Sequence, residues 1–214
     1  MEKGKITFPN YLIQKIILII TLLVSFPFAE KVLQHKSEIL HPKIVNTLKE
    51  FKKVNFWVEY GIESYKPSLR TYKSPYINDE VIISFTNENL AIFLNHIEKY
   101  FKWNNVAIEN NVTNDKKIGA TKITLSWEHG NDNWNTQETT MITHFFSQNE
   151  NRHQFVLMFY ELSFSDGWVK FKQPTMYFDY NDVVRLKQLL DSKYVKSTVE
   201  EWKEKQKEVD KLFE

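Results

Sequence analysis

The apolar run at residues 155–164 limits the fold of this chain more than any other feature. Eight of its ten residues are apolar, and its aromatic side chains favour extended backbone. The run is too short to cross a membrane as a helix. The Asp166-Gly167 pair that follows is typical of a tight two-residue hairpin turn. We therefore predict a central strand that returns through this turn into a second strand.

The turn also predicts which residues face one another in the hairpin. Leu157, Phe159 and Leu162 are expected in the core of the central strand. One face of the hairpin is apolar throughout and the other becomes polar near the turn, as in an antiparallel sheet covered fully on one side and partly on the other. The predicted pairs are Phe164 with Val169, Leu162 with Phe171, Tyr160 with Gln173, Glu161 with Lys172, and Leu157 with Met176.

Composition indicates an ordinary globular domain and excludes several classes of function. The chain has 214 residues, of which 42% are hydrophobic and 26% charged. Its five glycines form no phosphate-cradling loop of the GxGxxG or GxxxxGKS type, and the absence of cysteine excludes disulfides and cysteine-based zinc sites. Without the three Lys and one Glu of residues 1–29, the chain keeps 25 of its 28 basic and 26 of its 27 acidic residues. A nucleic-acid partner is therefore not expected.

Residues 1–29 have the pattern of an export signal. Three lysines precede a mostly apolar run at residues 16–28, which is typical of a secretory signal peptide. Ala29 would be the last residue removed, although Pro27 lies where a small residue is usual. If the segment stays uncleaved, residues 11–28 would form a short membrane anchor, the only membrane contact expected. Both alternatives place residues 30–214 outside the cytoplasm, as a periplasmic, secreted or anchored domain, and a buried core helix is the third alternative.

The whole domain is predicted to have its elements in the order α-β-α-β-β-β-β-α. The apolar spacing at residues 30–53 indicates a helix that Pro42 breaks or kinks. Residues 54–59 are expected to form a short strand, followed by an aromatic-rich loop to residue 80 that is a candidate binding surface. Residues 195–214 are expected to form a charged helix that docks on its own domain.

Two strand-to-helix joints are predicted from a weak internal similarity. In each, a short strand ends in Phe85 or Phe178, and Thr86 or Asp179 then caps a helix. A meander lies between the joints, and Pro174 is expected to split its last strand or to place it at the sheet edge. These patterns predict a single α+β domain at residues 30–214 with its core at 54–194, built as an antiparallel β-meander of 4–6 strands with helices mainly on one face.

His144 and His153 are the main candidates for a polar site. A hairpin turn at residues 149–150 would make their imidazoles diagonal neighbours on one face, and Glu128 and His129 could approach from the preceding turn. Zinc accepts such ligands, but a catalytic zinc needs three of them. No metal, no cofactor and no catalytic residue is therefore predicted. A register error of one residue would separate the two histidines.

Aromatic residues make up 15% of the chain and are expected mainly in the core. The predicted function, reached by elimination, is a non-enzymatic module that binds a protein partner, either as an immunity or inhibitor-type protein or as a subunit of an envelope assembly. One alternative is an exported hydrolase that uses His144 and His153 with nearby carboxylates. The other is a carbohydrate-binding module that uses exposed Trp residues. The aromatic residues proposed for binding are Trp57, Tyr60, Tyr65, Tyr72 and Trp134.

The export prediction can be tested without the domain. A reporter enzyme fused after residue 35 should appear outside the cytoplasm, because the basic start and the apolar run carry the signal by themselves. Cell fractionation measures where the reporter lies, and a fusion that lacks residues 1–29 is the control. A reporter that stays in the cytoplasm in both fusions would contradict the prediction.

Overall fold

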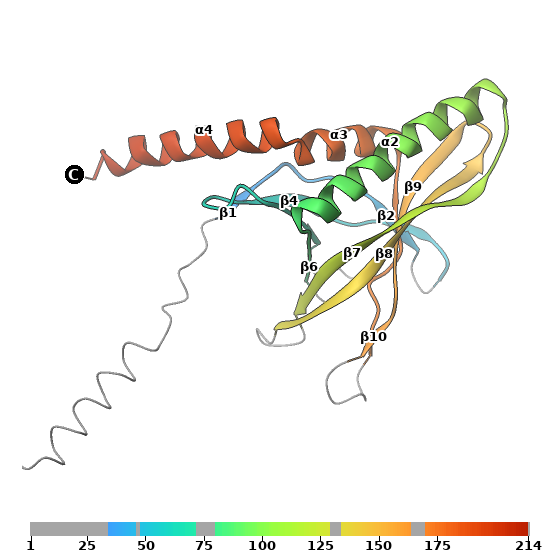
Figure 1. The fold of residues 1–214 in the computed structure, drawn as a ribbon, viewed down its shortest axis with the longest axis horizontal. Helices are drawn as coiled ribbons and strands as arrows, with labels where there is room; N and C mark the ends of the chain where they lie inside the picture. Colours follow the sequence, from blue (N-terminus) through green and yellow to red (C-terminus); the bar gives the residue numbers. More distant parts are fainter. Residues whose placement is uncertain (1–33, 46–47, 72–79, 129–133, 164–169, 214) are drawn as a thin grey trace, which may run out of the picture. The chain divides into compact units, whose positions relative to one another are not determined.

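The computed structural model describes residues 34–45, 48–71, 80–128, 134–163 and 170–213, and these form an α+β fold (Figure 1). Three helices lie in the described part of the chain: α2 (Asn87–Glu109), α3 (Tyr180–Leu190) and α4 (Ser192–Asp210). None of them combines the length and the apolar character needed to cross a membrane. The predicted signal peptide or anchor lies outside the described residues.

Ten strands form one antiparallel sheet, so the predicted number of 4–6 strands is too small. A separate ribbon pairs β10 (Leu162–Ser163) with β11 (Lys170–Phe171). Across the large sheet the order is β1 (Gln34–Lys36), β4 (Phe56–Gly61), β5 (Pro67–Thr71), β6 (Val81–Ser84), β7 (Asp115–Glu128), β8 (Trp134–Asn149), β9 (Arg152–Phe159), β12 (Met176–Phe178), β2 (Lys43–Val45) and β3 (Phe51–Lys53).

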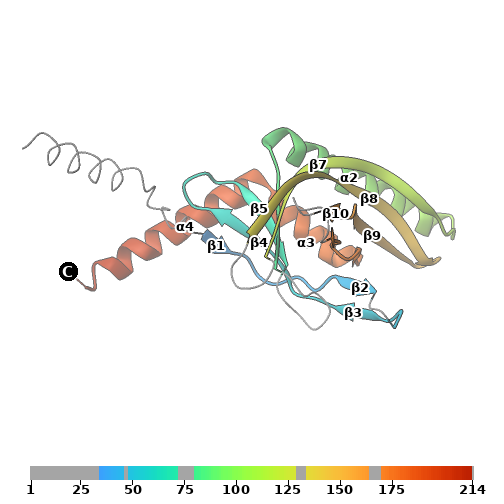
Figure 2. The ribbon, with the colours of Figure 1, turned by 90° about the horizontal axis from the view of Figure 1, so that it is seen from below.

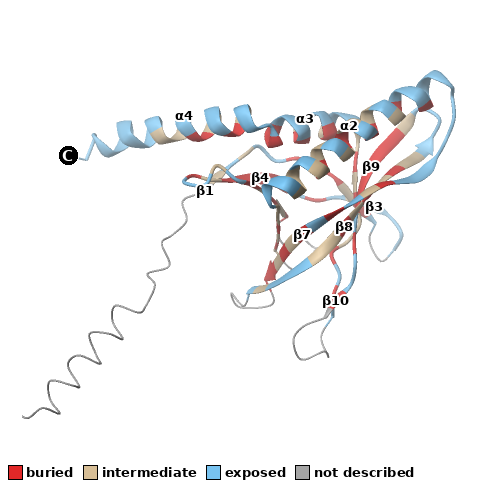
Figure 3. Ribbon diagram, in the orientation of Figure 1, coloured by how far each residue is buried: buried red, intermediate tan, exposed pale blue. Residues whose placement is uncertain are grey.

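The core lies between one face of this sheet and the helices. Along β7 the predicted alternation is confirmed, because Ile123, Leu125 and Trp127 are all buried. α2 packs against β7, β8 and β9, and α3 packs against β9 and β12. The apolar stripes of α2 and α3 supply the other half of the core (Figure 3), with Phe93, Ile97, Tyr100, Val183, Leu186 and Leu190 as its main side chains.

The chain between β1 and β2 ties the two ends of the sheet together. Leu40 and Phe56 exchange both of their backbone hydrogen bonds, at 2.7 and 3.1 Å. A few residues later the chain enters β2, which pairs with β12 at the opposite end of the sheet order. The ring of Phe56 meets the ring of Phe178 edge-on, with 5.1 Å between centroids. The sheet is therefore strongly curved (Figure 2), and its first strands approach its last.

The predicted helix at residues 30–53 is wrong over its described part, which contains β1, β2 and β3. Its apolar residues have helical spacing, but Pro42 cannot donate a helical hydrogen bond, and the flanking residues pair with strands at both ends of the sheet. The predicted loop after residue 59 is also shorter than expected, because β5 begins at Pro67. In both segments strand pairing prevails over the local pattern, with distant strands at residues 34–53 and with the neighbouring strands β4 and β6 at residues 67–71.

Both predicted strand-to-helix joints are confirmed. Thr86 and Asp179 are the N-cap residues of α2 and α3, with nearly identical backbone angles of φ −72°, ψ 163° and φ −72°, ψ 162°. The hydroxyl of Thr86 accepts the N–H of Asn89 at 3.1 Å. The carboxylate of Asp179 makes no such bond to its helix and is used elsewhere.

The predicted hairpin register is confirmed where it can be compared. Leu157 lies opposite Met176, and Leu162 lies opposite Phe171. The central strand is interrupted after Phe159, and Glu161 forms its ion pair with Lys170 at 2.9 Å rather than with Lys172. As expected, Pro174 separates β11 from β12, and Leu157, Phe159 and Leu162 are buried. Phe164, Val169 and the Asp166-Gly167 turn lie outside the described residues.

Gly119 allows α2 to dock closely on the sheet. It lies at the bulge where β7 shifts register against β8, and a Cβ atom built on it would lie 2.1 Å from Nε2 of His96. The other ring nitrogen of His96 lies 3.0 Å from Oγ1 of Thr143 on β8. The imidazole therefore occupies the space that any other residue at 119 would fill.

Gly119→Ala should lower the free energy of unfolding by about 1–3 kcal/mol, the usual cost of an overpacked contact. A decrease in the free energy of unfolding is informative, because Gly→Ala at an unstrained position more often increases it. His96→Ala in the Gly119→Ala background should recover part of the loss, since it removes the clashing ring. Urea denaturation of the two single variants, the double variant and the parent measures this coupling. Strictly additive effects would contradict it.

Candidate functional site

The structure separates the two histidines that the sequence placed together. His153 lies opposite Ser147, and His144 lies opposite Val156, one residue away from the predicted register. An irregularity between Ser147 and Asn149 adds a residue to β8 and turns the two imidazoles to opposite faces of the sheet. His144 Nδ1 lies 3.4 Å from a carboxylate oxygen of Asp115, on the outer face. The predicted pairing of His144 with His153 is wrong. The two side chains therefore do not form the joint site that the hydrolase hypothesis requires.

Glu128 does not join these histidines either. It lies at the end of β7 opposite Trp134, and His129 lies outside the described residues. Within the described ranges, no group of three His, Asp or Glu side chains is arranged to hold a metal ion.

The predicted aromatic binding residues are not brought together as one surface. Trp57 and Tyr60 are buried, at 4% and 0% exposure, and the hydroxyl of Tyr60 donates to the carbonyl of Leu189 at 3.1 Å. Neither ring offers an open face, which corrects their assignment as surface binding residues. Trp134 is 42% exposed, and Tyr72 lies outside the described residues.

Charged side chains gather on the outer face of β4, β5 and β6. The guanidinium of Arg70 pairs with Glu59 at 2.6 Å and with Glu80. Trp57 Nε1 lies 3.1 Å from Glu59, and the ring of Trp134 lies 5.9 Å from the Arg70 guanidinium carbon. Arg70 thus bridges two carboxylates, and these ion pairs tie β4 and β5 to the residue that precedes β6.

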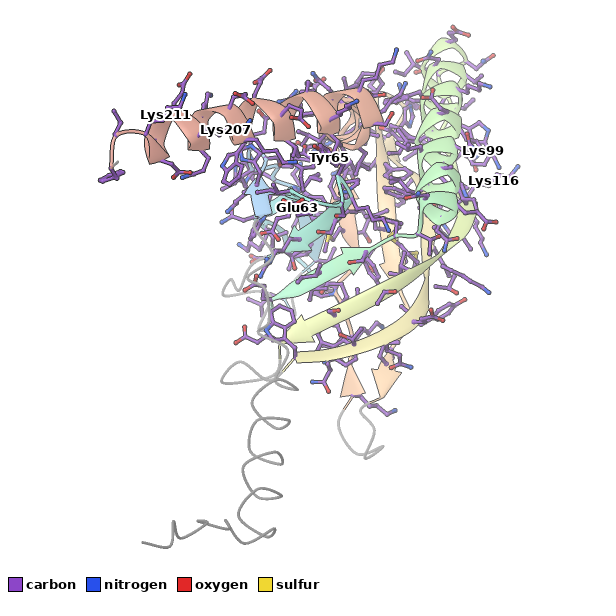
Figure 4. All side chains as sticks on the ribbon, turned by 60° about the vertical axis from the view of Figure 1, so that its left-hand side comes forward. Glu63, Tyr65, Lys99, Lys116, Lys207 and Lys211 are labelled. Carbon is purple, nitrogen blue, oxygen red and sulfur yellow. The ribbon has the colours of Figure 1, made fainter. Side chains whose placement is uncertain are left out.

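Tyr65 lies at the base of α4, in the turn between β4 and β5 (Figure 4). Its hydroxyl accepts a hydrogen bond from Lys203 Nζ at 2.8 Å and donates to Glu200. Lys203 Nζ also lies 4.5 Å from the centroid of the Tyr65 ring. A groove of about 870 Å³ runs from this turn to α2, with an apolar floor of Leu90, Ala91, Leu94, Leu190 and Val195.

Beyond the residues that contact Tyr65, α4 projects from the domain (Figure 1). Its first half buries Val195 and Val199 against the core, as the predicted docking helix should. Its second half is exposed (Figure 3), and Val209, Leu212 and Phe213 are 44%, 80% and 86% exposed. The predicted helix therefore docks through only half of its length. Residues 203–213 are called the α4 arm below.

The densest polar network surrounds the N-terminus of α3. The carboxylate of Asp179 accepts hydrogen bonds from Lys43 Nζ at 2.8 Å, from Gln154 Nε2 at 2.8 Å and from the guanidinium of Arg152 at 3.0 and 3.1 Å. Burial disfavours the charge of Asp179, but the hydrogen bonds from Lys43, Arg152 and Gln154 lower the pKa of its carboxyl to about 2. Asp182 has the opposite shift, because burial and then the charge of Asp179 raise its pKa.

A pocket of about 440 Å³ lies beside this network, between the β8–β9 turn, α2 and α3. His153 lines it and is 3% exposed; its Nδ1 lies 2.8 Å from Ser147 Oγ, and its Nε2 has no hydrogen-bond partner. Burial lowers the pKa of His153, which favours the neutral imidazole at pH 7. The other lining residues are Asn104, Asn105, Ile108, Asn151, Arg152, Asp179, Tyr180 and Asn181. The pocket lined by His153 and these residues is called the polar pocket below.

No protein-family model, no curated protein and no solved structure matches this chain. The function therefore has to be argued from the geometry of these surfaces alone.

Sequence reasoning found only part of the polar pocket. It identified His153 as a polar candidate and Asp179 as a helix cap. It missed Arg152, Lys43 and Asn104, which carry no local signal: Lys43 and Asp179 are 136 residues apart. The concentration of Asn and Arg at residues 149–152, next to a candidate histidine, was the one available hint.

Asp179→Asn should lower the free energy of unfolding at pH 7 by about 1–2 kcal/mol. Hydrogen bonds to a charged group contribute roughly 1.5–3 kcal/mol, and partial exposure reduces that value. Because the folded pKa lies below the usual 3.8, this stabilisation is present above pH 3.8 and is lost as the pH falls through about 2. Urea denaturation of both proteins across this range should show the difference shrinking.

Asp182→Asn is the matched control, one turn along the same helix. Its carboxyl has a raised pKa, so removing its charge should keep or increase stability at pH 7. Equal losses in the two variants at every pH would contradict the assignment of the stabilising network to Asp179.

Proposed function

We propose that this protein is a non-enzymatic binding module that holds a helix of a protein partner on the α4 arm. The observation that supports it is the exposure of Leu212 and Phe213, which are 80% and 86% exposed at the end of a helix that leaves the domain. Large apolar side chains grouped on a projecting element are typical of an interaction surface.

The apolar side chains of the arm continue a stripe that is already used for packing. Val195, Trp202 and Val209 follow one another at seven-residue intervals, so they lie on one face of α4. Val195 is buried against the domain and Trp202 is half-buried, whereas Val209 is open. The first half of α4 packs this face against the domain. The arm continues the same face beyond the domain, where a second helix can pack on it in the same manner.

The charges of the arm favour a protein over a membrane or a nucleic acid. Residues 203–213 carry four basic and three acidic side chains, so the arm has a net charge of only +1. Anionic lipids and phosphate backbones are recognised by basic surfaces, which this segment does not provide. Mixed charges beside an apolar stripe are typical of helix pairing, in which they set partner and orientation.

The cellular setting proposed with this function is outside the cytoplasm, with a partner in the cell envelope or beyond it. An exported or anchored domain would present the arm to a partner outside the cytoplasm, as an immunity or inhibitor-type protein or as a subunit of an envelope assembly. The basic and apolar pattern of residues 1–29 supports this setting.

Site-specific photo-crosslinking in the source cells tests the proposal. A benzophenone amino acid placed at 209, 212 or 213 should give one adduct of defined mass with a second protein. The same group at 207 or 211, on the opposite face of the helix, should give little of it (Figure 4 shows both lysines on the arm). Phe213→Glu should reduce the adduct formed from position 209 by at least about tenfold.

Three results would contradict the proposal. Adducts formed equally from both faces would show that no particular face is used. An adduct with twice the mass of the chain would make the occupant a second copy. Flotation of the purified protein with anionic vesicles, lost on Phe213→Glu, would make it a membrane surface.

A further inference from the structure

We propose that the polar pocket binds an uncharged, polyhydroxylated ligand of the saccharide class. This site is separate from the α4 arm, and its ligand does not depend on the protein-binding function proposed above.

Two polar side chains of the pocket, His153 and Asn104, have polar atoms that no described residue binds. Asn104, on the buried face of α2, is 5% exposed, and its side-chain amide forms no hydrogen bond with a described residue. His153 is 3% exposed, and its Nε2 is likewise without a partner. Buried polar groups are nearly always hydrogen-bonded, because an unsatisfied one costs about 1–3 kcal/mol. His153 Nε2 is such a group, and the unbound amide of Asn104 lines the same pocket, so both point to a ligand that completes them.

The other polar groups of the pocket are held in place by the fold. Asp179 is fixed by Lys43, Gln154 and Arg152, so its side chain does not cap α3. The first N–H groups of α3 therefore receive no cap from the side chain of Asp179. The amides of Asn105, Asn151 and Asn181 add further donors and acceptors from three different elements.

The charges around the pocket argue against an ionic ligand. Lys43 and Arg152 both pair with Asp179, and Asp182 lies within the electrostatic influence of Lys43 and Asp179, so two cations are set against two carboxyl groups and no strong net charge attracts an ion. Asparagine amides both donate and accept, as hydroxyl groups do. A hydroxyl also satisfies His153 Nε2 in either tautomer, because it can donate to a bare nitrogen or accept from N–H. A carboxylate or phosphate oxygen could serve only the protonated nitrogen.

Tyr180 provides the apolar surface that a sugar ring needs. It is 43% exposed, and its ring is held edge-on by Phe101 at 5.4 Å between centroids. An aromatic ring in this position can pack against the C–H face of a sugar, while the amides bind its hydroxyls. The volume of about 440 Å³ lies within the range of small-molecule sites.

Saturation-transfer NMR with the full chain tests the proposal. The probes are glucose, galactose, N-acetylglucosamine, maltose and cellobiose, with inorganic phosphate and acetate as ionic probes followed by amide chemical shifts. At least one sugar should receive saturation, and neither anion should shift the amides of residues 151–153 or 179–181. Absence of transfer to every sugar at millimolar concentration, or binding of an anion in place of a sugar, would overturn the proposal.

Asn104→Leu separates binding from folding. It removes a buried amide without a partner, so thermal stability should stay the same or rise, whereas sugar affinity should fall at least about tenfold. Asn95→Leu, at an exposed position on the same helix, is the control and should leave sugar affinity unchanged. Unchanged affinity in Asn104→Leu would overturn the proposal. If that variant does not fold, Tyr180→Ala replaces it, with the same expected loss and the same overturning result.

Discussion

The structure depends on one constraint, which is the need to keep water away from the apolar face of a long, curved sheet. Helices α2 and α3 cover part of this face, and the sheet covers another part by bringing β4 towards β12. The edge-on contact of Phe56 with Phe178 and the backbone bonds between Leu40 and Phe56 hold that closure. Hydrophobic burial provides the driving force, and the backbone bonds fix the register in which it occurs. The close docking of α2 beside Gly119 belongs to the same constraint, because any gap there would open the core.

The same closure creates the polar pocket. β2 reaches β12 only because the chain crosses from one end of the sheet to the other, and this crossing brings Lys43 to Asp179. With its carboxylate bound to Lys43, Arg152 and Gln154, Asp179 takes the backbone conformation of an N-cap without its usual hydrogen bond. The stabilising network and the unsatisfied groups beside it are therefore products of one arrangement. Stability and ligand binding can still be separated there, since Asn104 belongs to the pocket but not to the network.

The two proposed binding surfaces differ in physical character. The α4 arm offers exposed apolar side chains on one helix, with charges of both signs beside them. It is suited to a partner that buries this apolar surface. The polar pocket offers amides, an imidazole and a partly exposed ring in a concave setting, and is suited to a small ligand with many hydroxyls. Because the two surfaces share no residue, a protein partner and a small ligand could occupy one molecule at the same time. Sugar recognition beside a protein-binding arm would fit a domain that works at a cell surface.

The sequence by itself determined the features that depend on near neighbours. Periodicity located the alternation of Ile123, Leu125 and Trp127, and residue type located the caps Thr86 and Asp179. The register predicted from the sequence, with Leu157 opposite Met176, is the one observed. Only the tertiary structure decided that residues 34–53 form strands and that an irregularity beside Ser147 separates His144 from His153. It also decided that Lys43 meets Asp179. The physical reason is that caps and turns are fixed by contacts a few residues long, whereas strand pairing and buried ion networks draw their energy from segments far apart in the chain.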